Sequence, residues 1–193
     1  MRDGVICLAT LLDTSRLHAL IRLANAWQGA IAASVLGKPP SSNTSLRRQH
    51  RDAAAALRGI SLRDPRVRVV LVDNPGFDCP PRFPFNLLRN VALSLCVEPF
   101  VLALDIDFVP LPLRTAYSTL RAISSTLPLH SNRAVVLPAF DLVRDQPDDE
   151  TTDVPDKRHV AQMLRSGALV PFGAAGGMRE VWPAGHSCET SPH

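Results

Sequence analysis

Two aspartates separated by one residue, Asp105 and Asp107, carry the clearest chemical signal in this sequence. They follow the apolar run 101–104, and Pro110 ends the segment. Such a run predicts a buried strand whose carboxyl end lies at the edge of an open α/β sheet, where ligands bind. Two carboxylates there form a hard-oxygen site for Mg²⁺ or Mn²⁺, which would bridge the phosphates of a nucleotide. The alternative is that both acids only cap a following helix.

A helix is expected in the segment before this strand, with Asn86 as its N-cap. Leu87, Val91 and Leu95 recur at four-residue spacing and predict one apolar face, with Leu88 beside them. Arg89 lies one turn into this helix, where it would point along the sheet edge toward a diphosphate. Its alternative role is that of an ordinary surface arginine.

The rest of the chain alternates strand and helix. Strands are expected over residues 5–11, 30–36, 67–72, 100–104 and 134–137. Helices are expected over residues 15–26, 46–58, 86–96, 113–127 and 158–166. Short, continuously apolar strands that alternate with helices favour a mostly parallel sheet covered on both faces. Residues 1–193 are expected to form a single domain.

Composition agrees with an α/β domain and argues against nucleic-acid binding. The chain has 193 residues, of which 46% are hydrophobic, enough for one core of moderate size. Its formal net charge is +3, and the arginines are scattered instead of forming a basic stripe with interleaved aromatic residues. No nucleic-acid partner is therefore expected.

The cysteines, the apolar run near the N-terminus and a glycosylation sequon do not determine the cellular compartment of the protein. Four cysteines show no C-x-x-C spacing, which argues against structural zinc, and Cys7 and Cys96 lie in apolar stretches that predict reduced, buried thiols. The apolar run 5–12 is too short to span a bilayer, so no membrane segment is expected. Asn43 begins an N-glycosylation sequon, a sign of secretory traffic that is common by chance.

The segment 83–110, FPFNLLRNVALSLCVEPFVLALDIDFVP, resembles the donor-binding core of glycosyltransferase family 49, which includes the LARGE-type glucuronyltransferases. Further segments agree in order and spacing with that family: the opening strand and helix (5–20), the second strand (29–35), VVLPAFD (135–141), Pro-Asp-Lys (155–157) and the Gly-His segment (185–190). The resemblance therefore extends over nearly the whole chain.

This resemblance implies a GT-A fold, which is a Rossmann-like α/β sheet with the Asp-x-Asp motif at its carboxyl edge. It implies inverting transfer of a sugar, glucuronate or xylose, from a UDP-sugar to a glycan or glycoprotein acceptor, with Mn²⁺ (or Mg²⁺) as cofactor. Asp107 is expected to ligate the metal directly. Asp105 is expected to bind it through water or to reach the ribose.

The same resemblance suggests roles for other residues. Thr10 and Leu11, together with Asn86 and Arg89, are expected to hold the donor. Asp141 stands where the family usually has glutamate and is the candidate catalytic base, with a strand-end cap as the alternative.

Near the C-terminus, His186 lies in a segment similar to the family's acceptor-side Gly-His motif, although Cys188 replaces the expected proline. Members of the family continue well past this motif, so the acceptor portion of the fold is expected to be incomplete here. They also work in the Golgi lumen behind a membrane anchor, so the resemblance implies a Golgi location.

Two other functions fit parts of the sequence. One is a non-catalytic domain that keeps the fold and weak UDP and metal binding. The other is a haloacid-dehalogenase-like phosphatase, with Asp105 as nucleophile and Asp107 as acid/base. That family needs a lysine before its second acidic pair, whereas here Asp148 and Asp149 precede Lys157.

Overall fold

The computed structural model describes residues 5–37, 44–73, 83–108, 110, 115–128, 134–142 and 157–172. The chain divides into two compact units, Met1–Ser131 and Asn132–His193, and each is described by itself. The single domain expected over residues 1–193 stays a prediction. Among the helices in these ranges, none combines the length and apolar content needed to cross a membrane.

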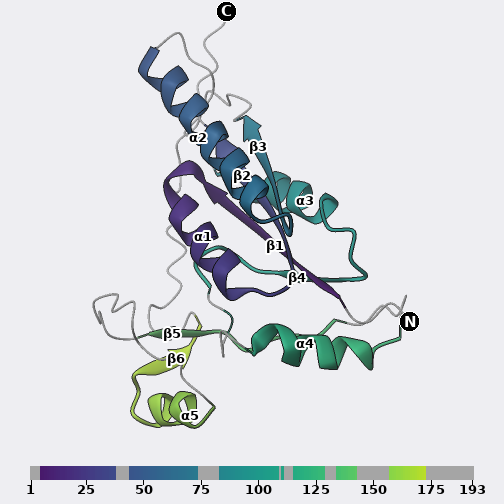
Figure 1. Cartoon of the computed structure of the whole chain (residues 1–193). Coiled ribbons are helices and arrows are strands. Elements are labelled where there is room, and N and C mark those ends of the chain that lie inside the picture. The colour runs from purple at the N-terminus through teal and green to yellow at the C-terminus, as the bar shows by residue number, and fades with distance from the viewer. Residues whose placement is uncertain are drawn as a thin grey trace, which may run out of the picture. The chain divides into compact units, whose positions relative to one another are not determined.

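The first unit is built around a four-stranded parallel sheet of order β3-β2-β1-β4 (Figure 1). Its elements in chain order are β1 (Ile6–Asp13), the 3-10 helix η1 (Thr14–Arg16), α1 (Leu17–Ala26), β2 (Ala30–Gly37), α2 (Thr44–Arg63), β3 (Val67–Asp73), α3 (Phe85–Ser94), β4 (Phe100–Ala103) and α4 (Ala116–Ser125). This arrangement confirms the predicted α/β, Rossmann-like fold.

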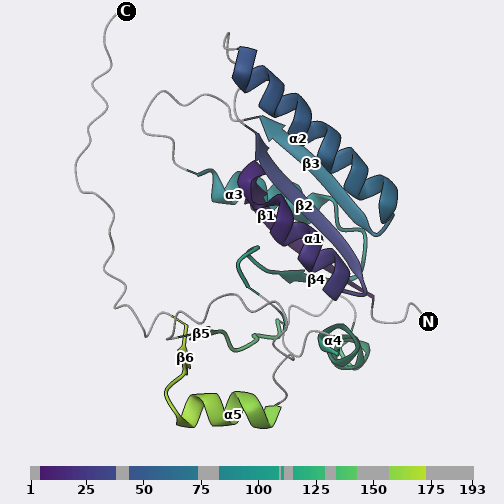
Figure 2. The same cartoon turned by 60° about the vertical axis from the view of Figure 1, so that its left-hand side comes forward.

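The two central strands are covered on both faces, as their continuous apolar sequences predict. Leu8 of β1 and Ile31 of β2 are buried in one cluster, to which α1, α2 and α4 also contribute side chains. Cys7 and Ala32 lie in a second cluster on the other face, against the segment that ends α3. Figure 2 shows α2 running alongside β3 on the outside of the sheet. Helices therefore cover both faces of the two central strands, whereas the edge strand β4, which was predicted to be buried, is partly exposed, with Val101 at 43%.

The strand order reverses between β1 and β4. The chain first adds β2 and β3 on one side of β1 and then returns to place β4 on the other side. In open α/β sheets such a reversal leaves a crevice at the carboxyl ends of the two strands, where ligands bind. In this chain the crevice lies between Asp13 at the end of β1 and the residues that follow Ala103 of β4.

Helix α3 is present but differs in detail from the prediction. It begins at Phe85, so Asn86 lies inside the first turn and is not the N-cap. Its buried side is formed by Leu88 and Ala92, whereas Leu87 is 44% exposed. Leu88 and Ala92 repeat the four-residue spacing on the helix face next to that of Leu87. This second face, which carries the small Ala92, packs on the sheet. There Ser34 of β2 donates a 2.7 Å hydrogen bond to the Leu88 carbonyl.

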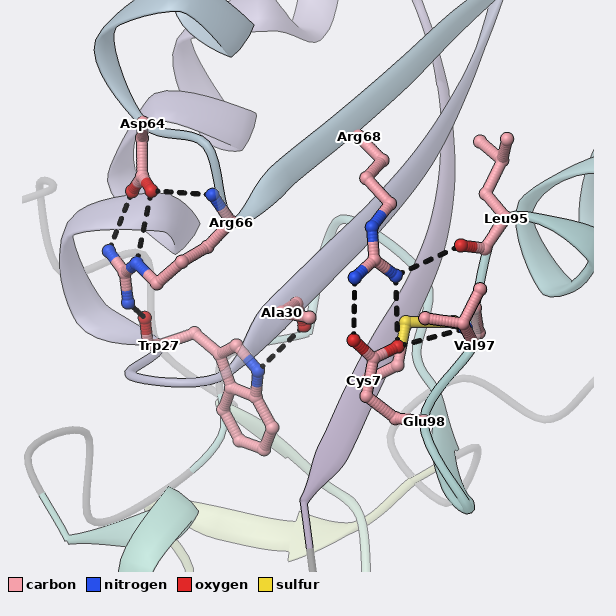
Figure 3. A network of polar contacts seen from close by, with 10 residues as sticks. Cys7, Trp27, Ala30, Asp64, Arg66, Arg68, Leu95, Val97 and Glu98 are labelled. Atoms are coloured by element: carbon pink, nitrogen blue, oxygen red, sulfur yellow. Dashed lines mark hydrogen bonds and ion pairs between the residues drawn. A yellow bond between two sulfur atoms is a disulfide. The ribbon is translucent and has the colours of Figure 1, made fainter.

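The expectation of two reduced thiols was wrong for Cys7 and Cys96, which form a disulfide with a Cα–Cα distance of 5.8 Å (Figure 3). Cys7 lies on β1 and Cys96 in the turn between α3 and β4. Their separation of 89 residues hides the pairing from local sequence patterns. The two cysteines come together only when α3 packs on the sheet.

A polar network beside this disulfide joins β3 to the same turn (Figure 3). The Arg68 guanidinium donates to both carboxylate oxygens of Glu98, at 2.6 and 2.9 Å, and to the Leu95 carbonyl at 3.0 Å. Hydrogen bonding from Arg68 holds the pKa of Glu98 below its ordinary value, against the opposing effect of burial. The Glu98 side chain is only 10% exposed, so this ion pair is part of the packed structure.

A tight turn before β2 packs against α4. The buried Trp27 side chain donates a 3.1 Å hydrogen bond to the Ala30 carbonyl and meets Tyr117 edge-on at a centroid distance of 5.1 Å. Gly29 lies between them, and a Cβ atom there would come within 2.7 Å of the Ile6 carbonyl oxygen. Only glycine fits this turn without movement of the backbone.

The second unit contains β5 (Phe140–Leu142), α5 (Lys157–Arg165) and β6 (Leu169–Pro171), and its two strands pair antiparallel. The strand predicted over residues 134–137 was wrong: these residues form no strand, and Val136 is 88% exposed. Pro138 interrupts this run and has no N–H to donate to a ladder. Pairing with β6 begins only at Phe140.

Replacing Gly29 by Ala should lower the free energy of unfolding by about 1–3 kcal/mol, the usual cost of overpacking. Gly59 is the matched control, because it lies within α2 and a Cβ atom there meets nothing within 4 Å. Gly59→Ala should be neutral or stabilising by up to about 1 kcal/mol. Urea denaturation measures both, and equal effects of the two substitutions would contradict the packing at Gly29.

The Arg68–Glu98 pair should make stability depend on pH. Since folding lowers the pKa of Glu98 from its ordinary value of 4.5, its contribution is fully present above that value and is lost as pH falls through the folded value. Glu98→Gln should therefore flatten the decline in unfolding free energy that sets in as pH falls below the ordinary pKa of 4.5. Urea titrations at several pH values measure this slope, and an unchanged slope in the variant would exclude the assignment.

Candidate functional site

The candidate site of the first unit is a cavity of about 250 Å³ at the crevice between β1 and β4. It is lined by the end of β1, by η1, by the start of α3 and by the turn after β4: Leu11, Leu12, Asp13, Arg16, Phe83, Phe85, Asp105, Ile106 and Asp107. Both aspartates of the Asp-x-Asp motif therefore lie at the topological reversal of the sheet.

The turn after β4 fixes the two aspartates. The Leu104 N–H donates a 3.0 Å hydrogen bond to the Ala9 carbonyl, which continues the pairing with β1 one residue beyond β4. The Phe108 N–H then donates to the Asp105 carbonyl at 3.0 Å and closes a turn. Ile106, between the two acids, is buried in the main core. Its burial anchors the turn and leaves the neighbouring carboxylates at the cavity.

Each of these carboxylates is paired with an arginine from a different element. Arg16, the last residue of η1, donates through Nη1 to Asp107 Oδ2. Arg89 of α3 lies with its Nη2 at 3.3 Å from Asp105 Oδ1. All four side chains are substantially exposed, between 44% and 67%. The site therefore holds two carboxylates and two guanidinium groups in contact with solvent.

Asp13 supports this arrangement from the end of β1. Its carboxylate accepts a 2.7 Å hydrogen bond from the Ser15 N–H and so caps η1, which carries Arg16. Partial burial acts to raise the pKa of Asp13, but hydrogen bonds from Ser15 and the nearby Arg16 charge outweigh it and hold the pKa below the ordinary value. Asp13 thus contributes a third carboxylate to the cavity wall.

The predicted donor-binding residues occupy different positions around this cavity. Leu11 lines it, and Arg89 reaches Asp105 at its edge. Asn86 is exposed on the first turn of α3, outside the cavity lining. Thr10 is only 2% exposed, and its hydroxyl is the buried side-chain group without a hydrogen-bond partner in the described ranges. Donor binding by these residues stays a prediction.

The remaining predicted residues lie elsewhere. Asp141 belongs to β5 of the second unit, opposite Val170 of β6, and its role as catalytic base stays a prediction. His186 and the sequon residue Asn43 lie outside the described residues.

The sequence prediction missed several residues that line this cavity, among them the polar Asp13 and Arg16 and the aromatic Phe83 and Phe85. The two phenylalanine rings contact each other with centroids 4.6 Å apart, and Phe85 is 52% exposed. The sequence could have indicated Asp13 and Arg16, because both lie at or just after the end of the first predicted strand. The carboxyl ends of parallel strands lie at the same edge of a sheet, so these residues are expected near those that follow β4. The two rings lie directly before the expected N-cap Asn86, and no local pattern there assigns them to a cavity.

A second group of potential metal ligands does not suit a metal. Ligand atoms of Cys7, Cys96 and Glu98 lie within 4.8 Å of one another. However, both sulfur atoms are used in the disulfide, and Glu98 is bound at both oxygens by Arg68. Hard carboxylate oxygens of the kind that Mg²⁺ and Mn²⁺ prefer are found instead around the cavity.

Comparison with known proteins agrees with the resemblance seen in the sequence. A family described as glycosyl-transferase for dystroglycan matches residues 76–189, more than half of the chain. The xylosyl- and glucuronyltransferase LARGE2s of Gallus gallus is 29% identical over 184 residues, covering 94% of this chain and 22% of that protein. The LARGE2 enzyme of Mus musculus is also 29% identical over 184 residues, or 24% of its length.

A third relative is the xylosyl- and glucuronyltransferase LARGE1 of Homo sapiens, which is 33% identical over 106 residues, or 54% of this chain and 13% of that protein. The chain thus spans less than a quarter of the length of each of these relatives.

Proposed function

Because the chain belongs to glycosyltransferase family 49, the glycosyl-transferases for dystroglycan, we propose that it binds a UDP-sugar together with Mn²⁺ (or Mg²⁺). We further propose that it transfers the sugar, glucuronate or xylose, to a glycan or glycoprotein acceptor. The observation that carries this proposal is the cluster of Asp105, Asp107, Arg16 and Arg89 at the reversal of the sheet.

The acids of the cavity fit a hard divalent cation. Asp105 and Asp107 supply carboxylate oxygens on side chains that are 45% and 67% exposed, and each carboxylate has one oxygen paired with an arginine. A hydrated ion that displaces these arginines would find the oxygen ligands that it prefers. We assign direct ligation to Asp107 and a water-mediated or ribose contact to Asp105. When bound, the cation supplies Lewis-acid stabilisation of the charge that grows on the leaving diphosphate, worth several kcal/mol.

Residues in and beside the cavity suit the remaining parts of a nucleotide sugar. Arg89 and Arg16 offer guanidinium groups, which pair bidentately with phosphate oxygens. Leu11 and the exposed Phe85 offer apolar surface for a nucleobase or a sugar face.

For the acceptor side, Asp141 is proposed as the catalytic base that takes the proton of the acceptor hydroxyl, and His186 as an acceptor-side residue.

The disulfide supports an oxidising compartment. Disulfides persist in the secretory pathway and outside the cell, whereas cytosolic thiols are kept reduced. The Cys7–Cys96 bridge joins β1 to the turn that precedes β4, both of which build the site. We therefore propose that the protein works in the Golgi lumen, as its family resemblance implies.

Replacing Asp107 by Asn should abolish the cooperative binding of UDP and Mn²⁺. The chain itself should bind Mn²⁺ weakly alone and more tightly with UDP, because the phosphate oxygens complete the octahedral shell that two carboxylates leave open. Isothermal titration of UDP with and without Mn²⁺ measures this. The matched control is Asp52→Asn, which changes an exposed aspartate on α2 whose partner is Arg48.

Identical titrations for the parent chain and Asp107→Asn would exclude the metal assignment. Transfer from UDP-glucuronate or UDP-xylose to a glycoside acceptor distinguishes an enzyme from a non-catalytic binding domain, since the latter would bind UDP and Mn²⁺ without transfer. Covalent acyl-phosphate formation at Asp105 would instead identify a phosphatase.

The compartment proposal predicts that Cys7 and Cys96 are bonded in protein made through the secretory pathway. Non-reducing mass spectrometry should find their two peptides linked, and reduction should lower the free energy of unfolding by about 2–5 kcal/mol. The double variant Cys7→Ser, Cys96→Ser serves as the control, because a reductant should leave its stability unchanged. Recovery of both cysteines as alkylated free thiols would contradict the proposal.

A further inference from the structure

Each acid of the Asp-x-Asp motif already has a cationic partner supplied by the chain. Arg16 reaches Asp107 from the segment after β1, and Arg89 reaches Asp105 from α3. Each arginine therefore occupies one oxygen of a carboxylate, Asp107 Oδ2 or Asp105 Oδ1, that the proposed function assigns to a metal or its water ligands. Arg16 matters more, because its partner Asp107 is the proposed direct ligand.

An arginine and a divalent cation compete for these carboxylate oxygens. A guanidinium held close to a bound cation is repelled by it, and the repulsion is relieved only when an anion lies between them. Exposed arginine–carboxylate pairs contribute little to the stability of a protein, so a competing ligand can separate them at little cost. Arg16 and Asp107 are 45% and 67% exposed, which places them in this class.

We propose that Arg16 is an exchange residue of the site, an inference that rests on the proposed function. Without ligand, its guanidinium is held by Asp107 and keeps cations from that carboxylate. When a nucleoside diphosphate enters with the cation, Arg16 leaves Asp107 and pairs with phosphate oxygens. Arg16 therefore opposes binding of the metal alone and favours binding of the metal with the diphosphate.

This role predicts opposite effects of one substitution on two ligands. Arg16→Ala should tighten binding of Mn²⁺ alone about two- to fivefold, the range expected from removing one exposed ion pair. The same change should weaken UDP at saturating Mn²⁺ by about tenfold, because a charge-assisted contact to phosphate is lost. A residue that only supports the fold would weaken both ligands or neither.

The experiment measures free Mn²⁺ by electron paramagnetic resonance and UDP by calorimetry on the full chain. Arg22→Ala is the matched control, because Arg22 is an exposed arginine on the following helix α1, outside the cavity lining. Arg16→Lys keeps the charge but loses the planar fork, so its UDP affinity should lie between those of the parent and Arg16→Ala. Circular dichroism verifies that each variant is folded.

The outcomes separate this inference from the proposed function. If the parent chain binds Mn²⁺ with UDP but Arg16→Ala leaves Mn²⁺ affinity unchanged or lowers it, the exchange role is overturned and the function stands. If Arg16→Ala tightens Mn²⁺ but adding Asp107→Asn does not remove the gain, the exchange partner is not Asp107 and the inference fails. If no variant binds Mn²⁺ with or without UDP, both proposals fail.

Discussion

The parallel pairing of β4 on the free side of β1 is the constraint on which the site depends. The backbone hydrogen bond from Leu104 to Ala9 carries this pairing beyond the last residue of β4 and brings the Asp-x-Asp turn level with the end of β1. Because β2 and β3 lie on the other side of β1, the two carboxyl ends border an open crevice. Without this reversal, with β4 added beyond β3 instead, strands β2 and β3 would separate Asp13 from Asp107 along the same edge of the sheet.

Much of the fold and part of the site could be predicted from the sequence. The apolar runs of β1 to β4 and the helices between them are local patterns, and they predicted the parallel sheet. The position of Asp105 and Asp107 followed from the same patterns, because a strand end determines where the next residues lie.

The features that were missed depend on contacts between distant segments. The pairing of Cys7 with Cys96 spans 89 residues, and the exposure of Leu87, which was expected on the apolar face, depends on how α3 rotates on the sheet. Residues 134–137 have an apolar composition, but pairing begins only after Pro138, at Phe140. Sequence patterns report which residues prefer to be buried, whereas these outcomes depend on which partner each residue meets.

The first unit uses the same chemical pair, arginine with carboxylate, in two environments with different consequences. Arg68 binds Glu98 through two short hydrogen bonds beside the disulfide, and the Glu98 side chain is 10% exposed. Removing one partner there would leave a charge with little water to solvate it, so this pair is structural. Arg16 and Asp107, at the opposite end of β1, are far more exposed, and water or a ligand can replace either partner at low cost. The two ends of β1 thus differ in burial. Near its start, the disulfide and the buried Arg68–Glu98 pair hold neighbouring elements together, whereas at its other end an exposed ion pair can be replaced by a charged ligand.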